Sequence, residues 1–364
     1  MEPTPSSPRH CEGKPPKTPR PDTRPWLDAH LDLACMALER DPDAPSLVAE
    51  ADPARAAITL PSLARGSVRC CLGTIFTAAH EPEDPCGYGD HEDRDGAHRA
   101  GLRQLELYEA WERAGLIRIV RGARELEACL EAPDGPPGVV LLMECADPIR
   151  TPEELPEWVA RGVRMVGLSW GHGSRYSGGN QRAGGLTPEG RDLVAALDDA
   201  GVAHDASHLS DESLDDLLAL SVGPIASTHS NARRLLPDGP RAIRHLRAEH
   251  ARAIAARGGV AGINLYGRFL AEGRRATLAD VVEHACVLAE DFGRDGIGLG
   301  SDADGGFTPA ELPVEVQSPE DYPRILEGLA EAGWTTEERA SFRGGAWRSF
   351  LRSIPAMRDA SLSG

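Results

Sequence analysis

Three ionisable side chains alternate along one short apolar stretch near the start of the chain. The segment "LDAHLDLAC" at 27–35 places Asp28, His30 and Asp32 at every second position. Alternate side chains of a strand point to the same face, so these three groups would lie together. An edge strand with a polar outer face would explain them, but imidazole and carboxylate are also ordinary ligands for zinc and similar ions. His30 and Asp32 alone make no site, so the rest of the chain must supply further ligands.

Other metal-type ligands follow apolar stretches further along the chain. Glu144 ends the run "GVVLLME", where an unpaired carboxylate would be costly to bury. His208 follows in "HDASHLS", His229 in "IASTHSNAR" and Asp302 in "GIGLGSDADGG". Each alone has an ordinary explanation as a loop histidine, a helix-capping acid or a turn-forming aspartate. Together they exceed the needs of one zinc, and two metals sharing a bridging carboxylate would use them all.

Strand and helix patterns alternate between these residues. Amphipathic stretches separate eight short apolar runs, and one helix is marked by Thr187 at its cap, Pro188 at its first position and Gly201 after its end. This alternation predicts an α/β fold with a parallel sheet, specifically a (β/α)8 TIM-type barrel of the kind found in metal-dependent hydrolases, with a doubly wound open sheet as the alternative. The predicted strands lie near 27–32, 67–77, 138–144, 163–169, 201–206, 223–229, 258–265 and 295–301, and the helices over 97–115, 187–200, 210–220, 242–257 and 277–292.

The barrel explains where the ligands fall, because the site of such a fold forms at the C-terminal ends of its strands. Five different predicted strands end in a metal-type ligand. No linker interrupts the pattern, so we expect a single catalytic domain over 25–355, closed by C-terminal helices over 318–332 and 336–352. Residues 1–24 are rich in Pro and polar groups and are predicted to be a disordered tail.

The composition excludes several functions. The 364 residues are 41% hydrophobic and 26% charged, which is typical of a globular protein with a sizeable core. The formal net charge of -18 argues against a nucleic-acid partner, because phosphate binding needs clustered Lys and Arg. No apolar run approaches the roughly 20 residues that span a bilayer, so we expect no membrane partner and a cytoplasmic location. Eight cysteines without a CxxC pair favour free thiols over a disulfide framework.

Several of these motifs, in the same order from about residue 27 to 350, resemble the membrane (renal) dipeptidase family of dizinc peptidases. They are "HLD" at 30–32, Glu144 after its apolar strand, "DASHLS" at 205–210, "ASTHSNAR" at 226–233 and "GLGSDADG" at 298–305. The resemblance implies two Zn²⁺ per chain: His30 and Asp32 would bind the more buried ion, His208 and His229 the second, and Glu144 would bridge them. It also implies that a metal-bridging hydroxide attacks the peptide carbonyl, while Asp302 holds that water and passes its proton to the leaving amine.

The resemblance also indicates substrate contacts. Arg241, in "LLPDGPRAIRHL", matches the family arginine that binds the substrate's terminal carboxylate if one extra residue is allowed, although a surface arginine near a helix start would look the same. Trp170 stands where the family often has a histidine that contacts the substrate carbonyl. His172, Arg175 or Tyr176 could take over that contact. The loop at 80–98 is expected to be a solvated segment over the barrel mouth.

The leading expectation is a dizinc dipeptidase that acts on small dipeptides and tolerates a D-residue at the C-terminal side. The altered loop around Trp170 leaves open the hydrolysis of another amide or lactam, such as an N-acyl amino acid. A metal-binding barrel without catalytic activity is the third reading. Relatives of this kind suggest a homodimer, although the sequence shows no interface signature.

Overall fold

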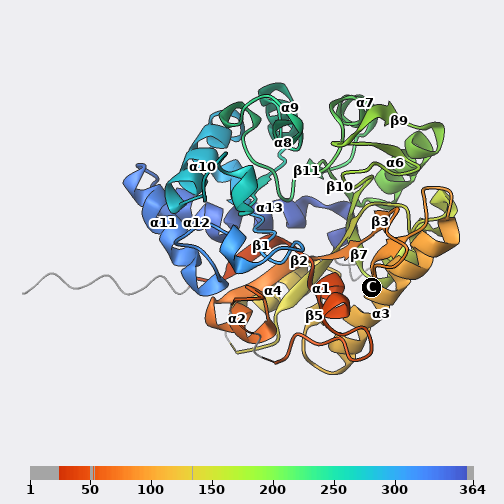
Figure 1. Cartoon of the computed structure of the whole chain (residues 1–364), viewed down its shortest axis with the longest axis horizontal. Helices are drawn as coiled ribbons and strands as arrows, with labels where there is room; N and C mark the ends of the chain where they lie inside the picture. The colour runs from red at the N-terminus through yellow and green to blue at the C-terminus, as the bar shows by residue number, and fades with distance from the viewer. Residues whose placement is uncertain (1–23, 50–51, 53, 133, 359–364) are drawn as a thin grey trace, which may run out of the picture.

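Eight parallel strands form the barrel of the protein, and a ninth strand of the same sheet, β5 (Arg118–Ile119), pairs with one of them outside this series. The computed structural model describes residues 24–49, 52, 54–132 and 134–358. The strands pair in the order β11-β10-β7-β6-β2-β1-β13-β12, and a parallel bridge beside β11 and β12 joins the two ends of this series. The result is the nearly closed (β/α)8 barrel that the sequence predicts (Figure 1). Its strands are β1 (Trp26–Leu31), β2 (Val68–Phe76), β6 (Gly138–Glu144), β7 (Val163–Gly167), β10 (Ala203–Asp205), β11 (Ile225–Ala226), β12 (Ala261–Ile263) and β13 (Ile297–Leu299).

Helices surround the barrel where amphipathic patterns predict them. The predicted helix over 242–257 is divided in two, and short 3-10 turns and small two-stranded sheets, including β4 (Gly87–Tyr88), β8 (Ser177–Gly179) and β9 (Arg182–Leu186), extend the loops. The helices are α1 (Leu33–Arg40), α2 (Leu60–Arg65), α3 (Arg94–Arg113), α4 (Ala123–Glu131), α5 (Leu155–Arg161), α6 (Pro188–Ala200), α7 (Asp211–Leu220), α8 (Pro240–Ile243), α9 (Ala248–Ala255), α10 (Leu278–Phe292), α11 (Tyr322–Glu331), α12 (Thr336–Ala340) and α13 (Ala346–Ser353).

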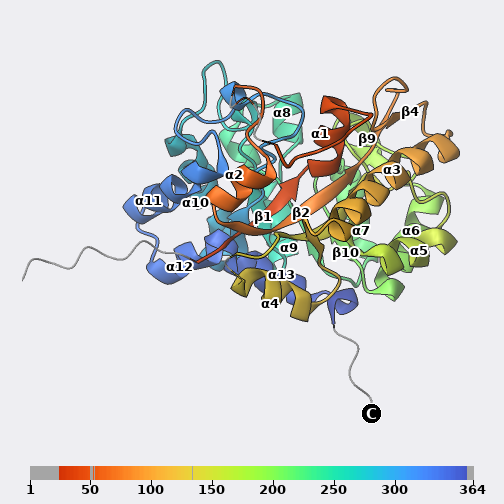
Figure 2. The ribbon, with the colours of Figure 1, turned by 90° about the horizontal axis from the view of Figure 1, so that it is seen from below.

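The N-terminal end of the barrel is filled by side chains. Alternate residues of the strands, such as Leu72, Val140 and Leu142, share one buried cluster with Trp347 and Phe350 of α13. A second and larger cluster lies between the strands and the surrounding helices. Figure 2 shows α13 at the end of the molecule opposite to α1 and α8. Because this end is packed, the residues that do chemistry must lie at the other end.

A disulfide joins α1 to the loop at 80–98. Cys35 of α1 is bonded to Cys86, which immediately precedes β4. The prediction of free thiols is therefore wrong for this pair, because a contact between residues 51 positions apart depends on how the loop folds back and leaves no spacing signal. The free cysteines of the described residues are Cys70, Cys71, Cys129, Cys145 and Cys286.

The predicted tail, except for Arg24, lies outside the described residues. Among the described residues, no helix is long and apolar enough to cross a bilayer.

Candidate metal centre

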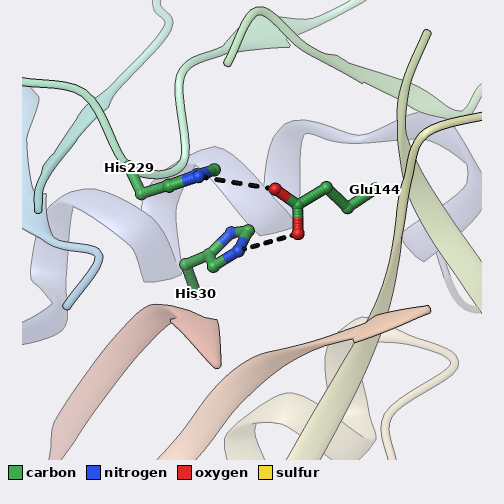
Figure 3. A group of neighbouring side chains, drawn as sticks. All are labelled: His30, Glu144 and His229. Carbon is green, nitrogen blue, oxygen red and sulfur yellow. Dashed lines mark hydrogen bonds and ion pairs between the residues drawn. The ribbon is translucent and has the colours of Figure 1, made fainter. Parts of the chain in front are cut away.

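Glu144 lies between three histidines at the C-terminal end of the barrel. Its Oε2 atom is 3.1 Å from Nε2 of His30. Its Oε1 atom is 3.0 Å from Nε2 of His208 and 3.5 Å from Nε2 of His229. Figure 3 shows the carboxylate of Glu144 facing His30 with one oxygen and His229 with the other. Each carboxylate oxygen thus faces a different imidazole set, which fits a carboxylate that bridges two cations.

The three histidines are oriented by oxygen atoms on their far sides. Thr228 Oγ1 lies 3.2 Å from Nδ1 of His30 and 2.9 Å from Nδ1 of His229, and the Thr228 hydroxyl itself donates to Asp205. Asn180 Oδ1 lies 3.2 Å from Nδ1 of His208. These acceptors favour the tautomer with the proton on Nδ1, so each Nε2 presents its lone pair to the centre of the site. Such partners are typical of metal-binding histidines.

Burial keeps the imidazoles of His208 and His229 neutral. Desolvation is the main reason that the pKa values of His208 and His229 lie well below the usual histidine range. The two Nε2 atoms of this pair are only 2.9 Å apart. Two neutral imidazoles with converging lone pairs form a donor set for a soft or borderline divalent cation such as zinc.

Asp32 and Asp302 complete the cluster. Ligand atoms of His30, Asp32 and Asp302 lie within 4.8 Å of one another, as do those of His30, Glu144 and His229. Thr74 of β2 donates its hydroxyl to Asp32, and the Asp32 N–H donates to Oδ1 of Asp304 at 3.0 Å. The structure therefore gathers the six predicted ligand and proton-transfer residues from five strand ends: His30, Asp32, Glu144, His208, His229 and Asp302.

Asp28 does not join this cluster, contrary to the alternation argument. The pairing register of β1 and β2 shifts between Asp28 and Leu31, and a shift of this kind breaks the two-residue period of a strand. Asp28 instead accepts hydrogen bonds from Ser301 N at 2.8 Å and from the Tyr322 hydroxyl at 3.0 Å. This aspartate holds β1 to β13 and α11.

Backbone strain marks the same end of the barrel. His208 has a φ of 65° and Asp302 a φ of 54°, and Cys145, which follows Glu144, has a φ of 75°. Non-glycine residues rarely adopt the left-handed region, and such strain concentrates at functional sites. Asn264 Nδ2 donates to Oδ2 of Asp302 at 2.8 Å and fixes its carboxylate.

The predicted substrate residues are distributed unequally. The Trp170 ring lies 5.2 Å from that of Phe76 and 5.9 Å from that of His208, at the centre of the site, and His172 packs behind it at 5.2 Å. Tyr176 is fully buried and donates its hydroxyl to the Ile149 carbonyl, so the structure does not bring it to the site.

Of the other two predicted substrate residues, only Arg241 lines a cavity of the site. Arg175 is held by Asp147, with Nε 3.5 Å from Oδ1, while Arg241 is exposed at the mouth of the site.

Arg244 was missed at the sequence level. Its side chain is buried, with Nη2 3.0 Å from Nε2 of His208 and donating to the His229 carbonyl at 3.0 Å. Its guanidinium carbon lies 5.6 Å from the centre of the Phe269 ring. The match to the family motif pointed to Arg241, which lies within α8, but the fold buries Arg244, which directly follows this helix.

Two cavities meet at the cluster. The arginine cavity, of about 720 Å³, is lined by Arg241 and Arg244 and by residues of the β8–β9 hairpin. The metal cavity, of about 310 Å³, is lined by Asp32, Glu144 and Asp302 among others. Trp170, His208 and Phe269 line both cavities. A ligand can therefore extend from one cavity into the other across His208.

A (β/α)8 barrel with histidines and carboxylates gathered at the C-terminal ends of its strands has the architecture of a metal-dependent hydrolase. Residues 22–362 match the model of the membrane dipeptidase family, peptidase family M19, and the chain belongs to this family.

Individual relatives agree with this assignment. The chain is 31% identical over 266 residues to an uncharacterized protein in the pqqA 5' region of Klebsiella pneumoniae, covering 70% of this chain and 92% of that one. It is 26% identical over 315 residues to dipeptidase tcpJ of Claviceps purpurea, covering 80% of this chain and 68% of the relative. A crystal structure of a Rhodobacter sphaeroides metallopeptidase, liganded with a phosphinate mimic of L-Ala-D-Ala, shares the fold with a TM-score of 0.78 at 24% identity, covering 92% of this chain and all of that one.

Proposed function

We propose that the protein is a dizinc dipeptidase that hydrolyses the peptide bond of small dipeptides, in the manner of a membrane dipeptidase. The observation that carries this proposal is the position of Glu144, whose two carboxylate oxygens face His30 on one side and His208 and His229 on the other. One cation would be held by His30 and Asp32 and the second by His208 and His229. The barrel over 25–355 would be the single catalytic domain.

Zinc at these residues would lower the pKa of a bound water and polarise the substrate carbonyl. Asp302 would move the proton. Burial raises the pKa of Asp302 to about 7, and cations on Asp32 and Glu144 would keep the carboxylate ionised and ready to accept a proton. Asn264 fixes its orientation, so that Asp302 can accept the proton of the attacking water and donate it to the leaving amine.

The substrate carboxylate would lie in the arginine cavity. Arg244 is the nearer of the two arginines to the cluster, because its guanidinium contacts His208, and Arg241 lies at the cavity mouth. A guanidinium matches the geometry of a carboxylate. Trp170, between the two cavities, would contact the middle of the dipeptide, with His172 behind it. Tyr176 would act only by supporting the loop.

The Rhodobacter sphaeroides metallopeptidase was crystallised with a phosphinate mimic of L-Ala-D-Ala. This ligand supports a substrate with a D-residue at the C-terminal side. The test is amine release from a panel of L,L and L,D dipeptides by zinc-loaded protein, with and without a chelator. We expect rapid hydrolysis that the chelator abolishes. No hydrolysis with two metals bound per chain would refute the proposal.

A second candidate is a dinuclear amidohydrolase acting on another amide or lactam, such as an N-acyl amino acid. Trp170 favours it, because an indole beside His208 cannot accept a proton or ionise as a histidine can. Comparing free-carboxylate dipeptides with their C-terminal amides separates the two, since a preference for amides would contradict a role for Arg244 in binding a carboxylate. A non-catalytic barrel would hydrolyse neither.

A homodimer and a cytoplasmic location stay predictions. The Cys35–Cys86 disulfide weighs against the second, because disulfides persist mainly in oxidising compartments.

A further inference from the structure

The two cavities of the site differ in charge. Arg241 and Arg244 both line the arginine cavity together with two acids, Asp211 and Glu212, and Asp211 is already paired with Arg233 at 2.8 Å and with Arg247 at 2.5 Å. The metal cavity is lined by four acids and, among the described residues, by no arginine. These acids are Asp32, Glu39, Glu144 and Asp302.

This difference sets the direction of a bound dipeptide. The terminal carboxylate is attracted to the arginine cavity, while the peptide carbonyl lies near His208, which both cavities share. The N-terminal residue then extends into the metal cavity. Of the acids there, Asp32, Glu144 and Asp302 belong to the metal cluster, which leaves Glu39 as the charge that meets the substrate side chain.

Glu39 is held in place by the helix that follows the first ligands. The helix α1 begins at Leu33, directly after Asp32, and Met36 and Glu39 lie one turn apart on the side that lines the metal cavity. The disulfide of Cys35 fixes the same helix. The carboxylate of Glu39 is exposed, and no arginine or histidine of the described chain forms an ion pair with it. Arg40, its neighbour along the helix, donates to the Ile58 carbonyl at 3.3 Å instead.

The remaining wall of the metal cavity is apolar. Met36 and Phe76 line one part, and the stacked rings of Tyr266 and Phe307, with centres 4.4 Å apart, line another. Long cationic side chains cover apolar surface with their methylene groups while the charged end reaches a polar partner. The apolar wall of the metal cavity, with the Glu39 carboxylate at its end, suits a side chain of this kind.

We propose that Glu39 makes the protein prefer dipeptides whose N-terminal residue carries a cationic side chain, lysine or arginine, and this inference rests on the proposed dipeptidase function. The contact is exposed and close to Arg40, so its effect is moderate. We expect kcat/KM for L-Lys-L-Ala to exceed that for L-norleucyl-L-Ala by about two- to fivefold, as for other exposed ion pairs. The two substrates differ mainly at the charged end of the side chain, so the ratio isolates the contact with Glu39.

The test compares both substrates in the wild type, in Glu39→Gln, in Glu39→Lys and in Glu106→Gln. Glu106 is an exposed acid on α3 that lines neither cavity, so Glu106→Gln removes the same charge elsewhere. Glu39→Gln should bring the lysine to norleucine ratio close to one by lowering kcat/KM for the lysine substrate. Glu39→Lys should invert the preference toward an N-terminal glutamate. Glu106→Gln should keep the wild-type ratio.

Two results would overturn the inference while leaving the dipeptidase function intact. One is a wild-type ratio near one with both substrates hydrolysed. The other is a Glu39→Gln variant in which both rates fall equally, because that would indicate a structural role. Failure of the wild type to cleave either substrate would instead refute the dipeptidase function on which the inference rests.

Discussion

At the scale of single residues, Thr228 contacts two of the predicted metal ligands. Its hydroxyl oxygen faces Nδ1 of both His30 and His229 while its proton goes to Asp205. The ring centres of these two histidines lie 3.6 Å apart, so one threonine sets the orientation of a stacked pair. Nothing in the sequence distinguishes Thr228 from other buried threonines, because its role depends on two strands that meet only in the barrel.

Thr228→Val should weaken zinc binding by about tenfold or more, because both imidazoles lose the acceptor that fixes their tautomer. Competition with a chromogenic chelator would measure the affinity. Thr77→Val is a matched control, since Thr77 is also buried and its hydroxyl has no hydrogen-bond partner in the described structure. Equal affinities for the two variants would show that the Thr228 hydroxyl does not orient the ligands.

The contributions of Arg241 and Arg244 to substrate binding can be tested separately. Replacing Arg244 by Lys or Ala should raise KM for dipeptides so that kcat/KM falls by about 100-fold, because a buried partner of the substrate carboxylate is lost. The same changes at the exposed Arg241 should lower kcat/KM by less than about fivefold. The corresponding C-terminal amides should be much less sensitive to Arg244. A larger loss of kcat/KM in the Arg241 variants than in the Arg244 variants would show that Arg241 binds the substrate carboxylate, as the sequence indicates.

At the scale of elements, the eight barrel strands and five regions of helix between them follow from the alternation of apolar and amphipathic segments, whereas α1, α2, α4 and α5 were not predicted. The six cluster residues were also found from sequence, because each stands at the end of an apolar run. What the sequence did not show depends on contacts across the fold, namely the displacement of Asp28, the burial of Tyr176, the position of Arg244 and the disulfide. Local patterns specify an element, but they do not specify which side chain of a loop turns inward.

Asp198, near the end of α6, joins this helix to the strand and loop that follow. It accepts hydrogen bonds at 2.8 Å from Nε2 of the buried His204, from the Ser221 hydroxyl and from Val222 N. Burial alone would raise the pKa of Asp198, but these hydrogen bonds outweigh it and lower the pKa to about 2.

Asp198→Asn should reduce the free energy of unfolding by about 1 to 2 kcal/mol near neutral pH. Because the folded-state pKa is depressed, this stabilisation is present above the unfolded pKa of about 4 and is lost as the pH falls toward 2. Denaturant unfolding of both proteins at pH 7 and pH 3 would measure it. A difference that stays constant over this range would mean that the carboxylate charge is not what stabilises the fold.

The disulfide stabilises α1 and the loop of 80–98 as a unit. Reduction, or the double change Cys35→Ser and Cys86→Ser, should lower the free energy of unfolding by about 2 to 4 kcal/mol. Thiol titration of the denatured, unreduced protein should find at most six reactive thiols, since two of the eight cysteines are bonded. Eight reactive thiols would show that the bond does not form in the protein as purified.

At the scale of the whole molecule, one end of the barrel is filled by packed side chains and the other end carries the candidate metal centre. Leu72, Val140 and Leu142 meet Trp347 and Phe350 at the packed end, and the Cβ that an alanine at Gly298 would add lies only 2.5 Å from the Trp347 ring. The strained residues, the histidines and both cavities lie at the other end. Stability and chemistry therefore occupy different halves of one barrel, as is usual for this fold.

The packing of α13 against the N-terminal end of the barrel also affects where a substrate enters and where products leave. Because the described residues fill that end of the barrel, a dipeptide would enter, and the two amino acids formed from it would leave, at the end where the two cavities lie. Released amino acids therefore compete with incoming substrate, and we expect an accumulating product that carries a free carboxylate to slow turnover competitively. Initial rates measured with added D-alanine or L-alanine would detect this product inhibition as a rise in the apparent KM. An unchanged KM would show that products leave by another route.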